Sequence, residues 1–311
     1  MKSSNRRISI VVATHERPEL LRRTLTNVTR QTLQPLEVVI VDDGSGPATR
    51  DAVFHWKEST RPRFHVHYQW QQNQGPATAR NRGLEASRGD WVQFLDDDDL
   101  MAPDALEQLA AVLEVGQTGI AMASYQYWQN GNPTGTCVAP KNLDADGRLR
   151  AMIQGTWFVP IHGYLFTRSA LEQIGPWNPV LTSQEDDEFL LRAAMARVPM
   201  HPAPKAKVYY CQHTGPRRAT PGKPGETEAQ GLERRMYADL AIRELAFESL
   251  SQKEDIENYR ISFGLWQMRL RKRYLPYLHK LNPPSELLQW LAAPVEEDSD
   301  ASDLPPPVAS V

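Results

Sequence analysis

The chain has 311 residues, enough for one large or two medium-sized domains with a hydrophobic core. Its formal net charge of −3 at pH 7 excludes a protein that binds nucleic acid through a general excess of basic residues. Its two cysteines, Cys137 and Cys211, form no CxxC pair, which excludes a disulfide framework and favours a reducing compartment.

The first segment of the chain predicts a strand, a helix and a second strand. Ile8–Ala13 is a short apolar run rich in β-branched residues, which is typical of a buried strand. Pro18 suits the first turn of a helix, and apolar residues then recur at helical spacing as far as Val28. Glu37–Val41 is a second buried strand. Such a βαβ unit implies parallel pairing of the two strands with a right-handed crossover.

The later elements follow the same alternation at first and then become less regular. Up to about residue 113 we expect strands at 64–68 and 91–95 and helices at 77–87 and after Pro103. Beyond this we expect strands at 120–127, 163–167 and 207–212, and helices before Gly175, at 183–196, at 232–250 and at 254–275. Segments 128–150 and 214–231, rich in Gly and Pro, predict loops.

This order of elements predicts an α/β fold with a mostly parallel sheet, in which ligands bind at the carboxyl ends of strands. Two acidic clusters follow predicted strands, namely Asp42–Asp43 and Asp96–Asp99. Adjacent carboxylates repel one another, and a divalent cation such as Mg²⁺ or Mn²⁺ takes oxygen ligands of this kind. The structural alternative is an acidic turn exposed to water before the next helix.

A second acidic segment, Gln184–Glu188, opens a predicted helix directly after Ser183. Ser183 and Asp186 have the spacing of a capping box, which is the structural alternative to a general base at this position. His213 follows the last predicted strand, and an imidazole beside carboxylates would suit Mn²⁺. The sequence has no GxxxxGK[ST] and no GxGxxG after its first strand, which argues against P-loop kinases and dinucleotide oxidoreductases.

Four stretches together resemble glycosyltransferase family 2, whose members have the GT-A fold, a Rossmann-like fold of nucleotide-diphospho-sugar transferases. The stretches are ISIVVATHERPELLRRTLTNVTRQT, EVVIVDDGS, NQGPATARNRGLEASRGDWVQFLDDDDLMAPDALE and SQEDDEFLLRAA. They occur in the order of the family and span roughly residues 8–215. The resemblance implies a metal-dependent, inverting transfer from a nucleoside-diphosphate sugar, with UDP favoured, to an acceptor hydroxyl of a glycan or a lipid-linked glycan.

The resemblance also implies roles for individual residues. Asp43 would accept the N3–H of a uracil or thymine base, because that donor needs an acceptor and a charge strengthens the bond. Gly75 would let the backbone approach the ligand. The expected nucleotide-binding residues are Thr14, Glu16, Asp43, Gly75, Arg80, Asp96 and Asp97. At Glu16 the chain departs from the family, which more often has T-Y-N or T-F-N where this sequence has T-H-E.

The DxD motif of the family matches Asp96-Asp97-Asp98, so Asp98 would hold Mn²⁺ or Mg²⁺ together with His213. The ED motif matches Glu185-Asp186, and Asp186 would be the general base. Arg217 and Arg218 in the following loop would contact the diphosphate.

The acceptor is expected to contact the less regular half of the main domain. Trp157, His162 and Glu185 are the candidate residues, because aromatic faces pack on sugar rings. Residues 266–280 carry five Lys or Arg residues, no acidic residue and interleaved aromatic and leucine side chains, which predicts peripheral contact with an anionic membrane. An ordinary basic helix packed on the domain is the alternative.

The resemblance predicts a GT-A domain at residues 1–220, with a nucleotide-binding half at 1–115 and an acceptor-side half at 116–220. A helical extension would cover 221–281, and the acidic, Pro-rich segment 282–311 would be a disordered tail. The apolar run at 8–13 is too short for a signal peptide, and no stretch has the length of a membrane span. We therefore expect a cytoplasmic protein, with contact at the inner face of the membrane left open.

Two rival functions stay open at this point. The first is a catalytically inactive protein that binds nucleotide sugars. The second is a metal-dependent nucleotidyltransferase with the same acidic cluster, although the glycine-rich start of such enzymes is absent after the first strand. A nuclease is disfavoured by the acidic net charge.

Overall fold

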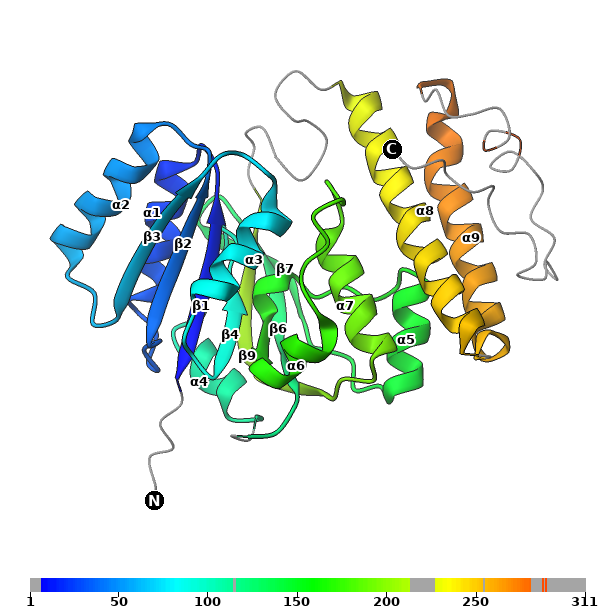
Figure 1. The fold of residues 1–311 in the computed structure, drawn as a ribbon, viewed down its shortest axis with the longest axis horizontal. Helices are drawn as coiled ribbons and strands as arrows, with labels where there is room; N and C mark the ends of the chain where they lie inside the picture. The colour runs from blue at the N-terminus through cyan, green and yellow to red at the C-terminus, as the bar shows by residue number, and fades with distance from the viewer. Residues whose placement is uncertain are drawn as a thin grey trace. The chain divides into compact units, whose positions relative to one another are not determined.

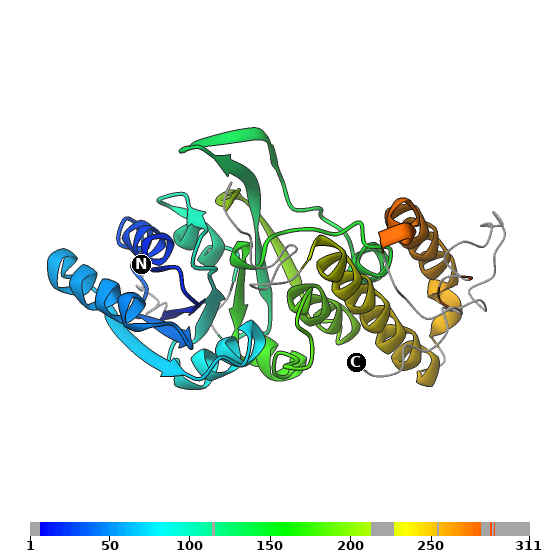
Figure 2. The same cartoon turned by 90° about the horizontal axis from the view of Figure 1, so that it is seen from above.

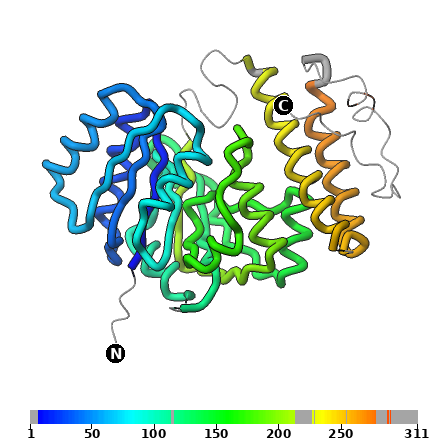
Figure 3. Tube along the Cα trace, viewed as in Figure 1, coloured from blue at the N-terminus to red at the C-terminus, as the bar shows by residue number. Residues whose placement is uncertain are grey.

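The computed structural model describes residues 7–113, 116–212, 227–253, 255–280, 287 and 289. The chain forms two compact units and passes between them several times (Figure 3). Unit 1 comprises the described residues of 1–142, 159–180 and 196–213, and unit 2 those of 143–158, 181–195 and 214–311. Unit 2 therefore includes segments on both sides of the domain boundary predicted at residue 220. The assignment of functions to the predicted domains stays a prediction.

Unit 1 is built on one sheet with the strand order β3-β2-β1-β4-β8-β6-β9-β5, to which β7 is added beside β6. The strands are β1 (Ile8–Thr14), β2 (Glu37–Asp43), β3 (His65–Gln71), β4 (Trp91–Phe94), β5 (Leu100–Met101), β6 (Ile120–Gln129), β7 (Asn132–Val138), β8 (Tyr164–Thr167) and β9 (Met200–Cys211). The helices are α1 (Pro18–Val28), α2 (Pro47–Thr60), α3 (Pro76–Ala86), α4 (Ala105–Ala110) and α6 (Arg168–Ile174). A short 3₁₀ turn, Ile161–Gly163, precedes β8.

Strands β1 to β4 form the parallel half of the sheet, as predicted. β1 pairs in parallel with β2 on one side and with β4 on the other, so the strand order reverses at β1. Figures 1 and 2 show α1 and α3 on opposite faces of this part of the sheet. Helices on both faces explain why β2 is buried over its whole length. The crevice at the carboxyl ends of β1 and β4 is where such a fold binds ligands.

The other half of the sheet is mixed, unlike the mostly parallel sheet that the sequence predicts. β8 pairs antiparallel with both β4 and β6, and β9 pairs in parallel with β6. β6 and β7 form a hairpin that projects from one face of unit 1 (Figure 2). The segment 128–150, predicted as a loop, thus contains β7 and the first part of α5 (Ala145–Ile153), a helix of unit 2.

Unit 2 is helical in its described residues. Its α-helices are α5 (Ala145–Ile153), α7 (Glu185–Met195), α8 (Glu228–Gln252) and α9 (Arg260–Tyr274), and its 3₁₀ turns are Ile256–Tyr259 and Leu275–Lys280. Helices α8 and α9 lie side by side (Figure 1). Phe247 of α8 packs edge-on against Phe263 of α9, with ring centroids 5.3 Å apart. The predicted tail lies outside the described residues, except for residues 287 and 289.

None of the helices in the described parts of the chain combines the length and the apolar character needed to cross a membrane.

Candidate active site

Helix α1 holds the acidic loop, Asp96–Asp99, at the carboxyl end of β4. Arg17, just before α1, places its Nη1 3.2 Å from Asp97 Oδ1 and 2.7 Å from Asp98 Oδ2. The Thr24 hydroxyl lies 3.0 Å and 2.9 Å from the carbonyl oxygens of Asp97 and Asp99. The loop is therefore fixed from one side by a cation and a hydroxyl that sequence reasoning missed.

Burial and mutual repulsion make the ionised form of the acidic loop costly. Burial raises the pKa of Asp97 to about 6, although Arg17 and the Thr14 hydroxyl, 2.7 Å from Asp97 Oδ2, oppose the shift. Burial and the carboxylates of Asp99 and Asp97 hold the pKa of Asp98 well above its ordinary value. A loop with this excess of buried negative charge is stabilised by a cation.

Asp99 and His162 form a buried pair behind the loop. Asp99 is 1% exposed and His162 is fully buried, and His162 Nδ1 lies 3.0 Å from Asp99 Oδ2. The backbone N–H of Cys211 donates to Asp99 Oδ1 over 2.6 Å. Burial alone would lower the pKa of His162, but the neighbouring Asp99 outweighs it, so that this pKa is raised. His162 is thus paired with the acidic loop and fully buried, and its predicted contact with the acceptor stays a prediction.

Asp96, Asp99 and His162 form a group that could hold a metal ion. One ligand atom from each of the three lies within 4.8 Å of the others. The buried Nε2 of His162 has no hydrogen-bond partner among the described residues, as expected of an atom kept for a ligand. Carboxylate oxygens with one imidazole suit Mn²⁺. The predicted ligand Asp98 is paired with Arg17, and the predicted ligand His213 lies outside the described residues.

Asp43, at the end of β2, anchors the segment that leads into α3. Its Oδ1 accepts hydrogen bonds from Gln71 Nε2 over 2.7 Å and from the backbone N–H of Gln74 over 2.8 Å. Its Oδ2 accepts the backbone N–H of Gly75 over 2.8 Å. Gly75 has a φ of 90°, and a Cβ built there meets nothing within 4 Å, so the space that the prediction requires at this backbone is present.

Glu16 contacts the loop after β2. Its Oε1 accepts the backbone N–H of Gly46 over 2.7 Å, and its own N–H donates to Ser45 Oγ over 2.7 Å. Its φ of 56° is unusual for a residue other than glycine. The departure from the family pattern at Glu16 therefore has a structural role of its own, which links the ends of β1 and β2.

Arg80 supports the first aspartate of the acidic loop. Its Nη2 donates to Asp96 Oδ1 over 2.9 Å, and its guanidinium carbon lies 4.7 Å from the ring centroid of Trp177. Asn81 holds Trp177 in place by exchanging hydrogen bonds with its backbone over 2.9 and 2.8 Å. Arg80, which the resemblance assigns to nucleotide binding, thus contacts Asp96, while Trp177 was not foreseen.

In unit 2, Glu185 and Asp186 occupy the first turn of α7. The helix begins at Glu185, and Gln184 before it has a left-handed φ of 57°. It therefore starts one residue later than a capping box from Ser183 would require. Both acidic side chains are half-buried. The predicted loop residues Arg217 and Arg218 lie outside the described residues.

The segment predicted to contact a membrane lies in α9 and the 3₁₀ turn after it. Trp266, Leu270 and Tyr274 are no more than 2% exposed and pack inside unit 2. Three of the apolar side chains behind that prediction are thus taken up by the protein core, whereas Leu275 is 52% exposed. The exposed cations Arg269, Lys272 and Arg273 are the charged groups of the segment that could contact a ligand or a surface.

The Asp187 carboxyl, next to Asp186, should give the protein a pH-dependent stability. Burial raises its pKa above 3.8, with Arg243 opposing the shift and Asp239 adding to it. Because the folded state holds the proton more tightly, stability contributed by this group is present below about pH 4 and is lost as the pH rises through its folded pKa. The unfolding free energy of Asp187→Asn, relative to that of the wild type, should therefore increase as the pH rises above about 4. Urea titrations with Asp51→Asn as control measure this, and parallel pH profiles would contradict it.

Solved structures of other proteins share the fold of this chain. The UDP complex of S. aureus TarS 1–349 matches with a TM-score of 0.58 at 17% identity, over 86% of this chain and 72% of that one. PcManGT from Pyrobaculum calidifontis, a mannosyltransferase in complex with GDP-Man and Mn²⁺, matches with a TM-score of 0.52 at 22% identity, over 87% of this chain and 75% of that one. At such identities the likeness shows the fold alone.

Sequence relatives are closer. EpsH of Bacillus subtilis (strain 168), whose name describes a glycosyltransferase, is 28% identical over 197 residues, which are 60% of this chain and 55% of that relative. TuaG of the same strain, named for teichuronic acid biosynthesis, is 31% identical over 156 residues, which are 50% of this chain and 61% of that relative. The chain thus spans little more than half the length of such relatives.

The likeness to these solved glycosyltransferases shows that the chain has the GT-A fold. A family model described as glycosyl transferase family 2 matches residues 9–175, more than half of the chain. The chain belongs to that family.

Proposed function

We propose that this protein transfers a sugar from a nucleoside-diphosphate sugar, with UDP favoured, to an acceptor hydroxyl, in a metal-dependent reaction that inverts the anomeric centre. The observation that carries the proposal is the acidic loop at the reversal of the strand order. Burial raises the pKa values of Asp97 and Asp98, and the carboxylates of Asp96 and Asp99 lie close to His162, whose Nε2 has no hydrogen-bond partner among the described residues. Such a site favours a divalent cation with a diphosphate.

The donor half of the reaction is assigned to unit 1. Asp43 recognises the base, and Thr14, Glu16, Gly75, Arg80 and Asp97 shape the nucleotide site around it. Asp96 faces the ribose. The metal is held by residues of the acidic loop, with Asp98, Asp96, Asp99 and His162 as the described candidates and His213 as a further one. Bound Mn²⁺ or Mg²⁺ would neutralise charge on the departing nucleoside diphosphate.

The acceptor half depends on Asp186. Its carboxylate takes the proton of the acceptor hydroxyl, and the oxygen attacks the anomeric carbon from the face opposite the leaving group. The new C–O bond forms as the bond between that carbon and the diphosphate oxygen breaks, and Arg217 and Arg218 contact the released diphosphate. Glu185 and Trp157 are assigned to the acceptor. No covalent intermediate with the enzyme is needed.

The acceptor is proposed to be a cell-surface glycan, polysaccharide or lipid-linked glycan. Names of relatives such as TuaG support this class. The direct test incubates the protein with single UDP-sugars, Mn²⁺ and candidate acceptors, and follows UDP release and the anomeric configuration of the product. Transfer with inversion is expected. A product with retained configuration would overturn the inverting mechanism.

Two outcomes would favour the rival functions. Production of a nucleotide sugar from a sugar 1-phosphate and a nucleoside triphosphate would identify a nucleotidyltransferase. Tight UDP-sugar binding without any turnover, across a broad panel of acceptors, would favour an inactive binding protein.

The Asp43→Asn variant should bind UDP roughly 10- to 100-fold more weakly, because a charged acceptor for the base N–H is lost and the anchors of Gln74 and Gly75 weaken. Calorimetric titration of UDP measures the change. Asp51→Asn, at an exposed carboxylate on α2, is the matched control. Equal UDP affinity in both variants would remove Asp43 from the base site.

A further inference from the structure

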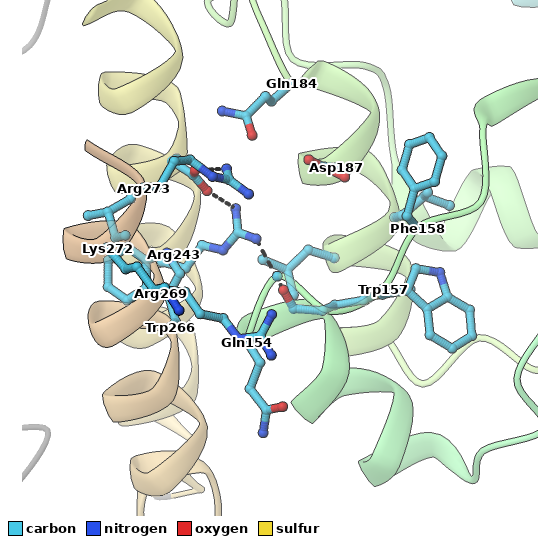
Figure 4. Close-up of a pocket in the computed structure, with 16 residues that line it drawn as sticks. Gln154, Trp157, Phe158, Gln184, Asp187, Arg243, Trp266, Arg269, Lys272 and Arg273 are labelled. Atoms are coloured by element: carbon cyan, nitrogen blue, oxygen red, sulfur yellow. Dashed lines mark hydrogen bonds and ion pairs between the residues drawn. The ribbon is translucent and has the colours of Figure 1, made fainter. Parts of the chain in front are cut away.

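Unit 2 contains a pocket that the proposed reaction does not explain. Its volume is about 430 Å³, and residues of α7, α8 and α9 and of the segment after α5 line it. Figure 4 shows the cationic side chains of α8 and α9 on one side of it, with Asp187 of α7 and Gln184, just before α7, on the other. All the lining residues belong to unit 2, so the pocket is a feature of that unit alone.

The lining carries an excess of positive charge. Arg243, Arg269, Lys272 and Arg273 face two carboxylates, Asp187 and Asp239. Asp239 is already shared, since its Oδ1 lies 2.9 Å from Arg243 Nη1 and its Oδ2 lies 3.0 Å from Arg273 Nη1. In the part of the chain that the structure describes, Arg269 and Lys272 make no ion pair. An anion is the ligand that this charge balance favours.

Two buried side chains with hydrogen-bond donors, Arg243 and Trp266, line one side of the pocket. Arg243 is 4% exposed and is held by Asp239 and by the carbonyl oxygens of Met152 and Ile153. Trp266 is 2% exposed, and its indole N–H has no hydrogen-bond partner among the described residues. A buried donor without a partner favours a ligand that can accept a hydrogen bond. This side of the pocket therefore favours a ligand with hydrogen-bond acceptors.

We propose that this pocket binds a phosphate or pyrophosphate ester carried by the acceptor. Arginine and lysine donors suit phosphate oxygens, and Phe158 of the lining, which is 43% exposed, offers an apolar surface to the sugar or lipid attached to the phosphate. Asp187 lines the pocket and is the next residue to Asp186 on α7, so a phosphate held here would keep the acceptor near the general base. The acceptor role rests on the proposed function, while the phosphate site does not.

Inorganic pyrophosphate, titrated calorimetrically in EDTA, is the probe. Without metal the donor site has little affinity for a diphosphate. The double variant Arg269→Gln/Lys272→Gln should bind pyrophosphate at least about tenfold more weakly than the wild type. Trp266→Phe, which keeps an aromatic side chain but replaces the indole by a smaller phenyl ring without the N–H, should weaken binding by about 2- to 10-fold. Lys205→Gln, an exposed charge on β9 of unit 1, should bind pyrophosphate like the wild type.

UDP titration with Mn²⁺ on the same preparations separates this inference from the proposed function. Variants with weaker pyrophosphate binding and unchanged UDP binding are the expected result. Equal pyrophosphate affinity in the wild type and the double variant overturns the phosphate site. Binding to phosphatidylglycerol vesicles without binding to pyrophosphate assigns the cations to a membrane surface and also overturns it. A wild type that binds pyrophosphate in the pocket but no UDP supports the phosphate site and overturns the donor assignment instead.

Discussion

The Asp186→Asn variant is expected to lower kcat by roughly 10²- to 10⁴-fold, the usual contribution of a positioned general base. Asparagine keeps the size of the side chain and its place in the first turn of α7, but it cannot take the proton of the acceptor hydroxyl. Steady-state kinetics of sugar transfer measure the loss. UDP affinity should stay at the wild-type value, because the donor is assigned to unit 1.

Glu185, the carboxylate next to Asp186, provides the comparison for this variant. Glu185→Gln removes a charge from the same helical turn and should lower kcat far less, because the glutamate is assigned to the acceptor and not to proton transfer. The base assignment fails if Asp186→Asn keeps most of its activity, or if Glu185→Gln loses as much as Asp186→Asn does.

The Asp99→Ala variant is expected to lose about 3–5 kcal/mol of unfolding free energy. The substitution leaves the fully buried His162 without its ion-pair partner and leaves the buried N–H of Cys211 without its acceptor. Removing one member of a buried pair costs this much because the remaining polar group has no access to water. Urea unfolding in EDTA measures the loss without any contribution from bound metal.

Asp90→Ala is the matched control, since this carboxylate is exposed just before β4, the strand that leads into the acidic loop. It should change the unfolding free energy by no more than about 0.5 kcal/mol. A similar loss in both variants would show that the Asp99–His162 pair has no special role in stability.

The sequence indicated where the acidic residues of the candidate site lie, because each group directly follows a buried strand. The apolar runs that became β1, β2 and β4 end in polar residues, and the carboxyl ends of parallel strands share one edge of the sheet. The predicted order of parallel strands alone therefore indicates that Asp43 and Asp96–Asp99 lie at the same edge of the sheet. The family resemblance then supplied their roles, which residue patterns could not.

The supporting contacts were not predictable in the same way. Arg17 meets Asp98, and His162 meets Asp99, across long sequence separations that only the folded sheet brings together. A lone histidine before a short strand carries no sign of its partner, so His162 was assigned to the acceptor. Its position between Pro160 and the strand β8, which pairs with β4, is what brings it against the loop.

Some elements were missed for a different reason. The helix α2 buries Thr49, Val53 and Trp56 at helical spacing, a sparse pattern of apolar residues on an otherwise polar segment. The strand β7 is exposed along most of its length and contains both Gly and Pro, which usually mark loops. It forms because its pairing with β6 supplies the backbone hydrogen bonds.

The most direct measurement of the central claim is a calorimetric titration of UDP, with Mn²⁺ and in EDTA, into the wild type, Asp98→Ala and the control Asp104→Ala on the segment before α4. The wild type and the control should bind UDP at least about tenfold more tightly with Mn²⁺ than without it, and Asp98→Ala should lose that difference. UDP binding that is indifferent to Mn²⁺, or equal in Asp98→Ala and the wild type, would contradict a metal-bound diphosphate at the acidic loop.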